Sequence, residues 1–202
     1  MTAPAQLYAL CVAAHGDFPP PHRAAEAGRG LAGAMLLQGV LAGRLDLYDD
    51  RVRPTGRGRR GDPVLDAFLA HVERSPRDRA PSDWVERLAP AALAAPRPGL
   101  LPGSTEPPGG RAGIRPREAL RRVRRSVAEP DRSALHPVAA GALLAASGLH
   151  DLCWPALSRD EASRRTLRAV AALGPAGLPV ARAATAVSHS LSGSAGALAF
   201  PG

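Results

Sequence analysis

Arginine is the residue type whose number and spacing could do chemistry in this 202-residue chain. All 26 basic residues are arginine, against 18 acidic residues, so the formal net charge is +8. Residues 51–60 hold five arginines and no acid, and residues 111–125 hold seven arginines and one glutamate. Guanidinium groups bind phosphate groups through paired hydrogen bonds. This pattern indicates a polyanionic partner.

The arginines that we expect to form a basic, membrane-facing surface are Arg57, Arg59, Arg60, Arg121, Arg122, Arg124 and Arg125. Near an anionic leaflet, each basic residue contributes about 1 kcal/mol to binding. Nucleic acid is the competing polyanion, but the chain has seven aromatic residues and no DNA- or RNA-binding motif, which disfavours recognition by base stacking. A solvated arginine face with no partner is the remaining interpretation.

Motifs for catalysis, cofactors and metals are missing from the sequence. The six histidines include no His-x-x-x-His pair, and there is no Gly-x-Ser-x-Gly, phosphate loop or dinucleotide fingerprint. Cys11 and Cys153 lie far apart in the sequence and have neither metal-ligand nor disulfide-framework spacing, so we expect two buried, reduced thiols. The sequence therefore predicts a protein that is not an enzyme and binds no cofactor or metal.

The elements that must position these arginines are mostly helices, because the apolar residues recur with the period of an α-helix. This period predicts a short apolar element at 5–14 and helices at 24–43, 64–74, 117–127, 134–149, from about 158 to 173 (carrying Leu167, Val170 and Leu173) and 178–187. A further helix starts at 81, and Pro90 is expected to shorten or interrupt it. Asp62 and Ser158 have the character of N-caps.

The remaining segments are short or irregular. Residues 44–48 alternate like a strand, 51–61 look like a loop, and 96–116 hold too many prolines and glycines for regular structure. We expect a mainly α fold with one domain at 1–187, a flexible tail at 188–202, and at most a short or degenerate β-hairpin.

Two long uncharged stretches raise the question of a membrane span. Residues 133–150 contain histidine, proline and glycines among alanines, which favours a buried core helix, and residues 183–202 contain several serines, which favours a fraying tail. The N-terminus has no basic region before its apolar stretch, so we expect a cytoplasmic protein. The lack of lysine and asparagine, against 41 alanines, indicates a GC-rich, actinobacterial-type source.

Four segments follow one another in an informative order: GLAGAMLLQGVLAGRLDL at 30–47, GDPVLDAFLAHV at 61–72, DWVERL at 83–88 and the segment 129–165. Together they resemble the Golgi phosphoprotein 3 family as it occurs in actinobacteria. The last segment resembles the part of the family where a Pro-Asp-x-Arg turn leads into an Ala/Leu helix. The resemblance implies a compact helical domain with a protruding hairpin, at 99–114 here, that acts as a peripheral membrane protein. In eukaryotic relatives this domain binds phosphatidylinositol 4-phosphate and links Golgi membranes to the tails of resident enzymes.

The resemblance also implies where a lipid headgroup would bind. The position of the family's tryptophan falls near Arg23, Ala32 stands where the family has an arginine, and Arg87 remains of a two-arginine helix. With Arg29, these arginines are the candidate headgroup residues. Because Ala32 lacks the central guanidinium, we expect phosphatidylinositol 4-phosphate to bind no better than other lipids of equal charge.

The combined hypothesis is a non-catalytic peripheral membrane protein at the inner face of the membrane, which binds anionic lipid of the phosphoinositide type through arginine clusters. One alternative is a cytosolic protein–protein adaptor that does not touch lipid. A nonspecific nucleic-acid binder is the less favoured alternative.

Overall fold

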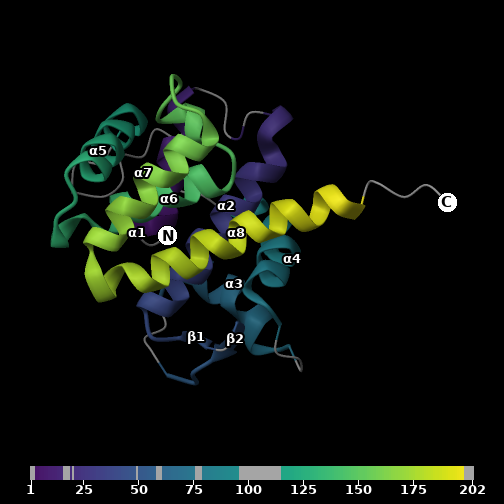
Figure 1. The fold of residues 1–202 in the computed structure, drawn as a ribbon. Coiled ribbons are helices and arrows are strands. Elements are labelled where there is room, and N and C mark those ends of the chain that lie inside the picture. Colours follow the sequence, from purple (N-terminus) through teal and green to yellow (C-terminus); the bar gives the residue numbers. More distant parts are fainter. Residues whose placement is uncertain are drawn as a thin grey trace.

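The computed structural model describes residues 3–15, 19, 21–48, 50–57, 61–75, 79–95 and 115–197. These residues form a mainly helical fold with one two-stranded antiparallel sheet, which confirms the predicted fold class (Figure 1). The α-helices are α1 (Ala3–Val12), α2 (Ala24–Leu41), α3 (Pro63–Glu73), α4 (Pro81–Ala94), α5 (Pro116–Ala128), α6 (Leu135–Ala146), α7 (Arg159–Ala172) and α8 (Leu178–Ala197). The strands are β1 (Leu45–Tyr48) and β2 (Arg51–Pro54), and 3-10 turns are η1 (Ala13–His15), η2 (Pro21–Arg23), η3 (Arg132–Ala134), η4 (His150–Leu152) and η5 (Gly174–Gly177).

Helix α2 runs through the centre of the fold and packs against α1, α4, α6 and α8. Its glycines allow this close packing. A Cβ atom at Gly30 would lie 1.9 Å from the Tyr8 hydroxyl of α1, and one at Gly28 would lie 2.9 Å from the carbonyl oxygen of Ala89 in α4. The helix predicted at 24–43 is therefore confirmed, and its small residues let its neighbours approach it closely.

Helix α6 is the second enclosed element. Every residue from 137 to 145 is buried, as the prediction of a core helix at 134–149 requires. It packs against α1, α2, α5, α7 and α8. Over the residues that the structure describes, no helix combines the length and the apolar character needed to cross a bilayer.

Helix starts follow the predicted caps. The Asp62 side chain accepts hydrogen bonds from the backbone N–H groups of Val64 and Leu65, and the Ser158 hydroxyl accepts one from the backbone of Glu161. The prediction that Pro90 shortens or interrupts the helix from 81 is wrong, because α4 continues from Pro81 to Ala94. Proline frees the carbonyl four residues earlier, here that of Glu86, whose position is exposed and open to water.

The sheet is a hairpin in which Leu45 pairs with Pro54 and Tyr48 with Arg51. Residues 51–54 were predicted as part of a loop, which is wrong because they form β2. The reason is tertiary: Val52 is buried in the core and its backbone N–H donates to Arg79. The hairpin that the family resemblance places at 99–114 falls outside the described residues.

The last two helices add two details to the predicted pattern. Of the apolar residues on the helix that begins near Ser158, Leu167 is 52% exposed, whereas Val170 and Leu173 are buried. The last helix does not end near 187 but continues to Ala197. Helix α8 thus crosses the boundary between the predicted domain at 1–187 and the predicted tail at 188–202. The division itself stays a prediction.

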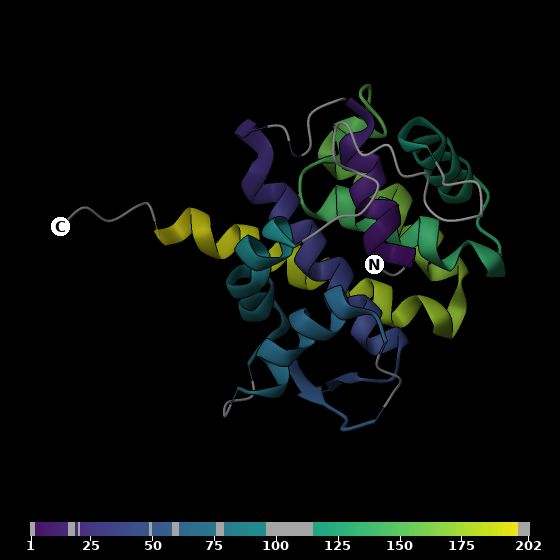
Figure 2. The ribbon, with the colours of Figure 1, turned by 180° about the vertical axis from the view of Figure 1, so that it is seen from behind.

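The described parts of the two arginine-rich segments, residues 51–57 and 115–125, lie at different ends of the fold. In both views α5 and α7 lie together at one end, and β1 and β2 lie at the other (Figures 1 and 2). The core between them consists mainly of α1, α2 and α6, which contact one another.

Candidate functional site

Helix α5 presents arginine to solvent along one side. Its buried side consists of Ala119, Leu120, Val123 and Val127, which pack toward α1 and α6. Four arginines of the predicted basic surface lie on this helix, and all four are exposed. They form what we call the α5 arginine face: Arg121, Arg122, Arg124 and Arg125. The 3.6-residue period separates the two sides, because the aliphatic residues recur every three or four positions and arginines fill the positions between them.

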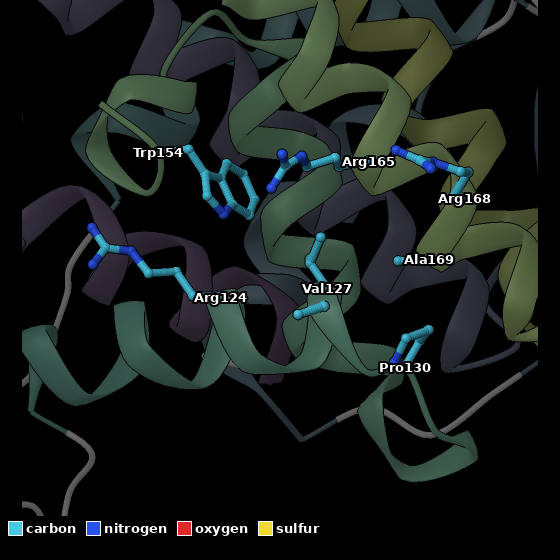
Figure 3. Close-up of a pocket in the computed structure, with 8 residues that line it drawn as sticks. Arg124, Val127, Pro130, Trp154, Arg165, Arg168 and Ala169 are labelled. Atoms are coloured by element: carbon cyan, nitrogen blue, oxygen red, sulfur yellow. The ribbon is translucent and has the colours of Figure 1, made fainter. Parts of the chain in front are cut away.

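A pocket of about 430 Å³ lies between α5, α7 and the segment that follows η4 (Figure 3). We call it the α5–α7 pocket. Its cationic lining is Arg124, Arg165 and Arg168, its aromatic lining is Trp154, and its remaining lining residues are Val127, Ala128, Pro130 and Ala169. Figure 3 shows the side chains of Arg165 and Arg168 extending along α7 in the direction of Trp154.

Hydrogen bonds hold the cationic side chains of this pocket without using all their donors. Nε of Arg124 donates to the carbonyl oxygen of Cys153. Nε of Arg165 donates to Oε1 of Glu161 at 3.0 Å, and Arg164 binds the other oxygen of that carboxylate at 2.9 Å. Arg168 has no hydrogen-bond or ion-pair partner within the part of the chain that is described. Several terminal guanidinium nitrogens around the pocket are therefore available to an anion.

Among the described residues, no acidic side chain lines the α5–α7 pocket, and neither does a hydroxyl, thiol or imidazole. A guanidinium stays protonated at physiological pH and is a poor proton-transfer group, whereas its fork of N–H donors suits phosphate. The arrangement is thus fitted to hold an anion.

The other predicted basic residues are not part of this surface. Arg57 is exposed just after β2, where its backbone N–H donates to the Thr55 hydroxyl at 3.1 Å. Arg59 and Arg60 lie outside the described residues. The predicted loop and helix arginines therefore do not combine into one patch in the part that the structure describes, since the hairpin and α5 are at opposite ends (Figure 1).

The cysteines meet inside the fold although they are distant in sequence. Cys11 and Cys153 are both free and buried, as expected from the sequence. A hydrogen bond with Cys153, together with burial, raises the pKa of the Cys11 thiol. A thiol kept protonated in this way is a poor nucleophile and a poor metal ligand. No group of three or more potential metal ligands occurs among the described residues.

Comparison with protein families gives a match over nearly the whole chain. The family model described as Golgi phosphoprotein 3 (GPP34) matches residues 4–189, from α1 into α8. The chain belongs to the Golgi phosphoprotein 3 family. The resemblance noted from the four sequence segments is thereby confirmed. Comparison with curated proteins and with solved structures gave no match.

Two of the headgroup arginines implied by the Golgi phosphoprotein 3 resemblance are bound to carboxylates. Arg23 lies 3.1 Å from Asp151 and also donates to the carbonyl oxygen of Gly148. Arg29 binds Glu86 through two hydrogen bonds, Nε to Oε2 at 2.7 Å and Nη2 to Oε1 at 2.9 Å. Arg23 thus points to the connection between α6 and α7, and Arg29 to α4.

The third arginine of the Golgi phosphoprotein 3 set, Arg87, is exposed on α4 next to Glu86. A pocket of about 230 Å³ between α2 and α4 is lined by Arg29 and Glu86 together with small and apolar residues, and Arg87 does not line it. Ala32 is completely buried. In this member of the family, Arg29, the cation among the described residues that line the α2–α4 pocket, is therefore already neutralised by a carboxylate.

Sequence reasoning found Arg124 but missed Arg165, Arg168 and Trp154. The signal for the two α7 arginines was present, because residues three apart on a helix share a face. Trp154 is one of only two tryptophans, yet it lies in an irregular segment. No local pattern indicates that α7 packs beside α5, so the sequence did not reveal that these three residues and Arg124 surround one pocket.

Proposed function

We propose that this Golgi phosphoprotein 3 family member is a peripheral protein of anionic membrane surfaces, at the cytoplasmic side, and that the α5 arginine face is its lipid-contacting surface. The observation that carries the proposal is the exposure of Arg121, Arg122, Arg124 and Arg125 on one amphipathic helix. At about 1 kcal/mol for each basic residue near an anionic leaflet, four such residues suffice for reversible, salt-dependent attachment.

The proposal assigns binding to charge and not to the headgroup pocket implied by the family. Arg29 is paired with Glu86, and Ala32 contributes no guanidinium, so the lining of the α2–α4 pocket, as far as the structure describes it, offers no free cation for a phosphoinositide. Membership of the family supports a membrane role at the coarse level. Phosphatidylinositol 4-phosphate then binds through this pocket no better than other lipids of equal charge.

Vesicle sedimentation with a pair of charge-matched variants tests the proposal. The test variant is Arg121→Glu/Arg122→Glu/Arg125→Glu, and the control is Arg57→Glu/Arg74→Glu/Arg87→Glu, which has the same net charge but changes exposed arginines elsewhere. With phosphatidylglycerol vesicles at low salt, the test variant should lose binding by at least about tenfold and the control much less. Equal losses would contradict the assignment to α5.

The same proteins discriminate between the other hypotheses. Binding to phosphatidylglycerol should collapse as the salt concentration rises, because exposed charges are screened beyond about 10 Å at 0.1 M. Binding to neutral phosphatidylcholine vesicles of equal strength would contradict the proposal. Retardation of duplex DNA by the wild type that is lost in the test variant would point to nucleic acid, and partners captured at high salt without vesicle binding would point to an adaptor.

A further inference from the structure

We infer that the α5–α7 pocket is a binding site for an organophosphate. Its phosphate is held by Arg165 and Arg168, and its organic part packs against Trp154. The inference rests on the proposed function only in that the pocket opens beside the α5 arginine face. The two sites share Arg124, but the phosphate-binding arginines and the aromatic wall of the pocket are not part of the α5 arginine face, and the ligand has a defined chemistry.

The charge distribution selects an anion. Three guanidinium groups line the pocket with no carboxylate among the lining residues, and Glu161, which binds Arg165, is shared with Arg164. Arg165 uses only Nε in that ion pair, so both of its terminal nitrogens are left over. Arg168 is exposed and has no partner in the described part of the chain. A phosphate between these two forks would receive charge-assisted hydrogen bonds from each.

The size and the apolar lining select an organic phosphate over the inorganic ion. A volume of about 430 Å³ falls within the roughly 300–1,000 Å³ of small-molecule sites and is far larger than a phosphate ion needs. The half-buried indole of Trp154 and the side chains of Val127 and Pro130 supply a surface for carbon atoms. In Figure 3 the guanidinium group of Arg165 is directed toward this indole, which places cationic and aromatic surfaces together.

The pocket is built on rigid supports. Trp154 packs against α6, where a Cβ atom at Gly141 would lie 3.3 Å from the indole. Its backbone N–H donates to the carbonyl oxygen of His150 at 2.7 Å. Arg124 ties α5 to the same segment through the Cys153 carbonyl. The aromatic wall and the helix that carries Val127 are thus fixed to each other before a ligand arrives, which reduces the entropy cost of binding.

Tryptophan fluorescence gives a direct test with soluble probes. The chain has two tryptophans, and Trp84 is 2% exposed, so an anion in the pocket should change the emission of Trp154 alone. Glycerol 3-phosphate should produce a saturable change at lower concentration than inorganic phosphate, and chloride at equal ionic strength should produce none. In Trp154→Phe the change should disappear.

A matched pair of variants on α7 tests the role of the guanidinium groups. Arg168→Gln removes a charge from the pocket, and Arg164→Gln removes one from an exposed position of the same helix that does not line it. Arg168→Gln should weaken glycerol 3-phosphate binding by about tenfold or more, the loss typical of a charge-assisted hydrogen bond, and Arg164→Gln by less than about twofold. Equal weakening in both, or no saturable change with any phosphate, would overturn the inference.

Vesicles distinguish a lipid headgroup from a soluble ligand. Phosphatidic acid carries a phosphate monoester, whereas phosphatidylglycerol of matched surface charge does not. If the ligand is a lipid, wild type should prefer phosphatidic acid and Arg168→Gln should lose that preference. If it is soluble, glycerol 3-phosphate should bind and neither lipid should be preferred. Both results support an organophosphate site.

The two proposals fail separately. Arg121→Glu/Arg122→Glu/Arg125→Glu leaves the three pocket arginines in place and should still bind glycerol 3-phosphate, even where it no longer sediments with vesicles. Arg168→Gln should still sediment with phosphatidylglycerol. If the wild type binds vesicles but not glycerol 3-phosphate, the pocket alone is rejected. If it binds glycerol 3-phosphate but not vesicles, the membrane surface alone is rejected.

Discussion

Arg29 of α2 and Glu86 of α4 form a two-point ion pair, with 2.7 Å between Nε and Oε2 and 2.9 Å between Nη2 and Oε1. Hydrogen bonding to Glu86 is the main cause that raises the pKa of Arg29. The pair occupies the wall of the α2–α4 pocket, the region where the family resemblance implies a headgroup site. The carboxylate thus competes with any lipid phosphate for the same guanidinium.

Glu86→Gln should release Arg29 for anions. We expect binding to anionic vesicles to rise about fivefold at low salt, equivalent to about 1 kcal/mol for one cation at the surface. The unfolding free energy should fall by less than about 1 kcal/mol, because the glutamate side chain is half exposed. Asp83→Asn, an equal charge change on the same helix that frees no arginine, serves as the control in the sedimentation assay, and an equal rise there would attribute the effect to net charge.

Arg44 should be the most stabilising arginine of the fold's hairpin end. Its side chain is 3% exposed and binds Asp66 and, at 2.8 Å, Glu73, both of α3. Arg44→Met removes the guanidinium that binds both half-buried carboxylates and should cost about 2–3 kcal/mol in urea unfolding. Arg44→Lys should restore only part of this, because one ammonium cannot bind both carboxylates as the guanidinium fork does. The exposed Arg74→Met should cost less than about 0.5 kcal/mol, and a similar cost at both sites would contradict the assignment.

Gly30→Ala should destabilise the fold although alanine is the better helix former. The new Cβ would lie 1.9 Å from the Tyr8 hydroxyl and 2.3 Å from the nearest ring carbon, so we expect a loss of about 2 kcal/mol or more in thermal or urea unfolding. In Tyr8→Leu the clashing ring is removed, and Gly30→Ala should then be nearly neutral. Additive effects in this double-mutant cycle would show that the ring does not cause the loss.

His136 should make stability fall below neutral pH. Burial, with a contribution from Arg122, lowers the pKa of His136, so its imidazole stays neutral in the folded protein at pH values where the unfolded chain takes up a proton. Because the unfolded state binds more protons, the unfolding free energy decreases as the pH falls through about 6.5. Urea midpoints at pH 7.5 and 5.5 should differ less in His136→Gln than in wild type, and an unchanged difference would exclude His136.

Carboxylates do not interfere with that measurement. The pKa values of Asp131, Asp151 and Glu161 are lowered, so the stability that these groups contribute is present above their unfolded pKa of about 4 and is lost as the pH falls further. Their loss therefore belongs to a more acidic window than the one between pH 7.5 and 5.5.

Local sequence signals predicted the elements well where a short-range cause acts. Asp62 and Ser158 cap their helices because the side-chain oxygen reaches backbone N–H groups two or three residues ahead. Pro90 was misread because its cost depends on whether the freed carbonyl reaches water, and that is a property of the folded surface. β2 was missed for a similar reason, since Val52 is held by burial and by its bond to Arg79.

The sequence by itself determined the helical class, the family and the arginine side of α5. The reason is that hydrophobic periodicity, the order of motifs and the residue types can be read from neighbouring positions along the chain. Only the tertiary structure decided which arginines are free. Arg29 and Arg23 meet carboxylates distant in sequence, whereas Arg165 and Arg168 meet Trp154 and α5 around one pocket. The physical reason is that ion pairing and enclosure depend on distances of a few ångströms between separate elements, and packing alone sets these distances.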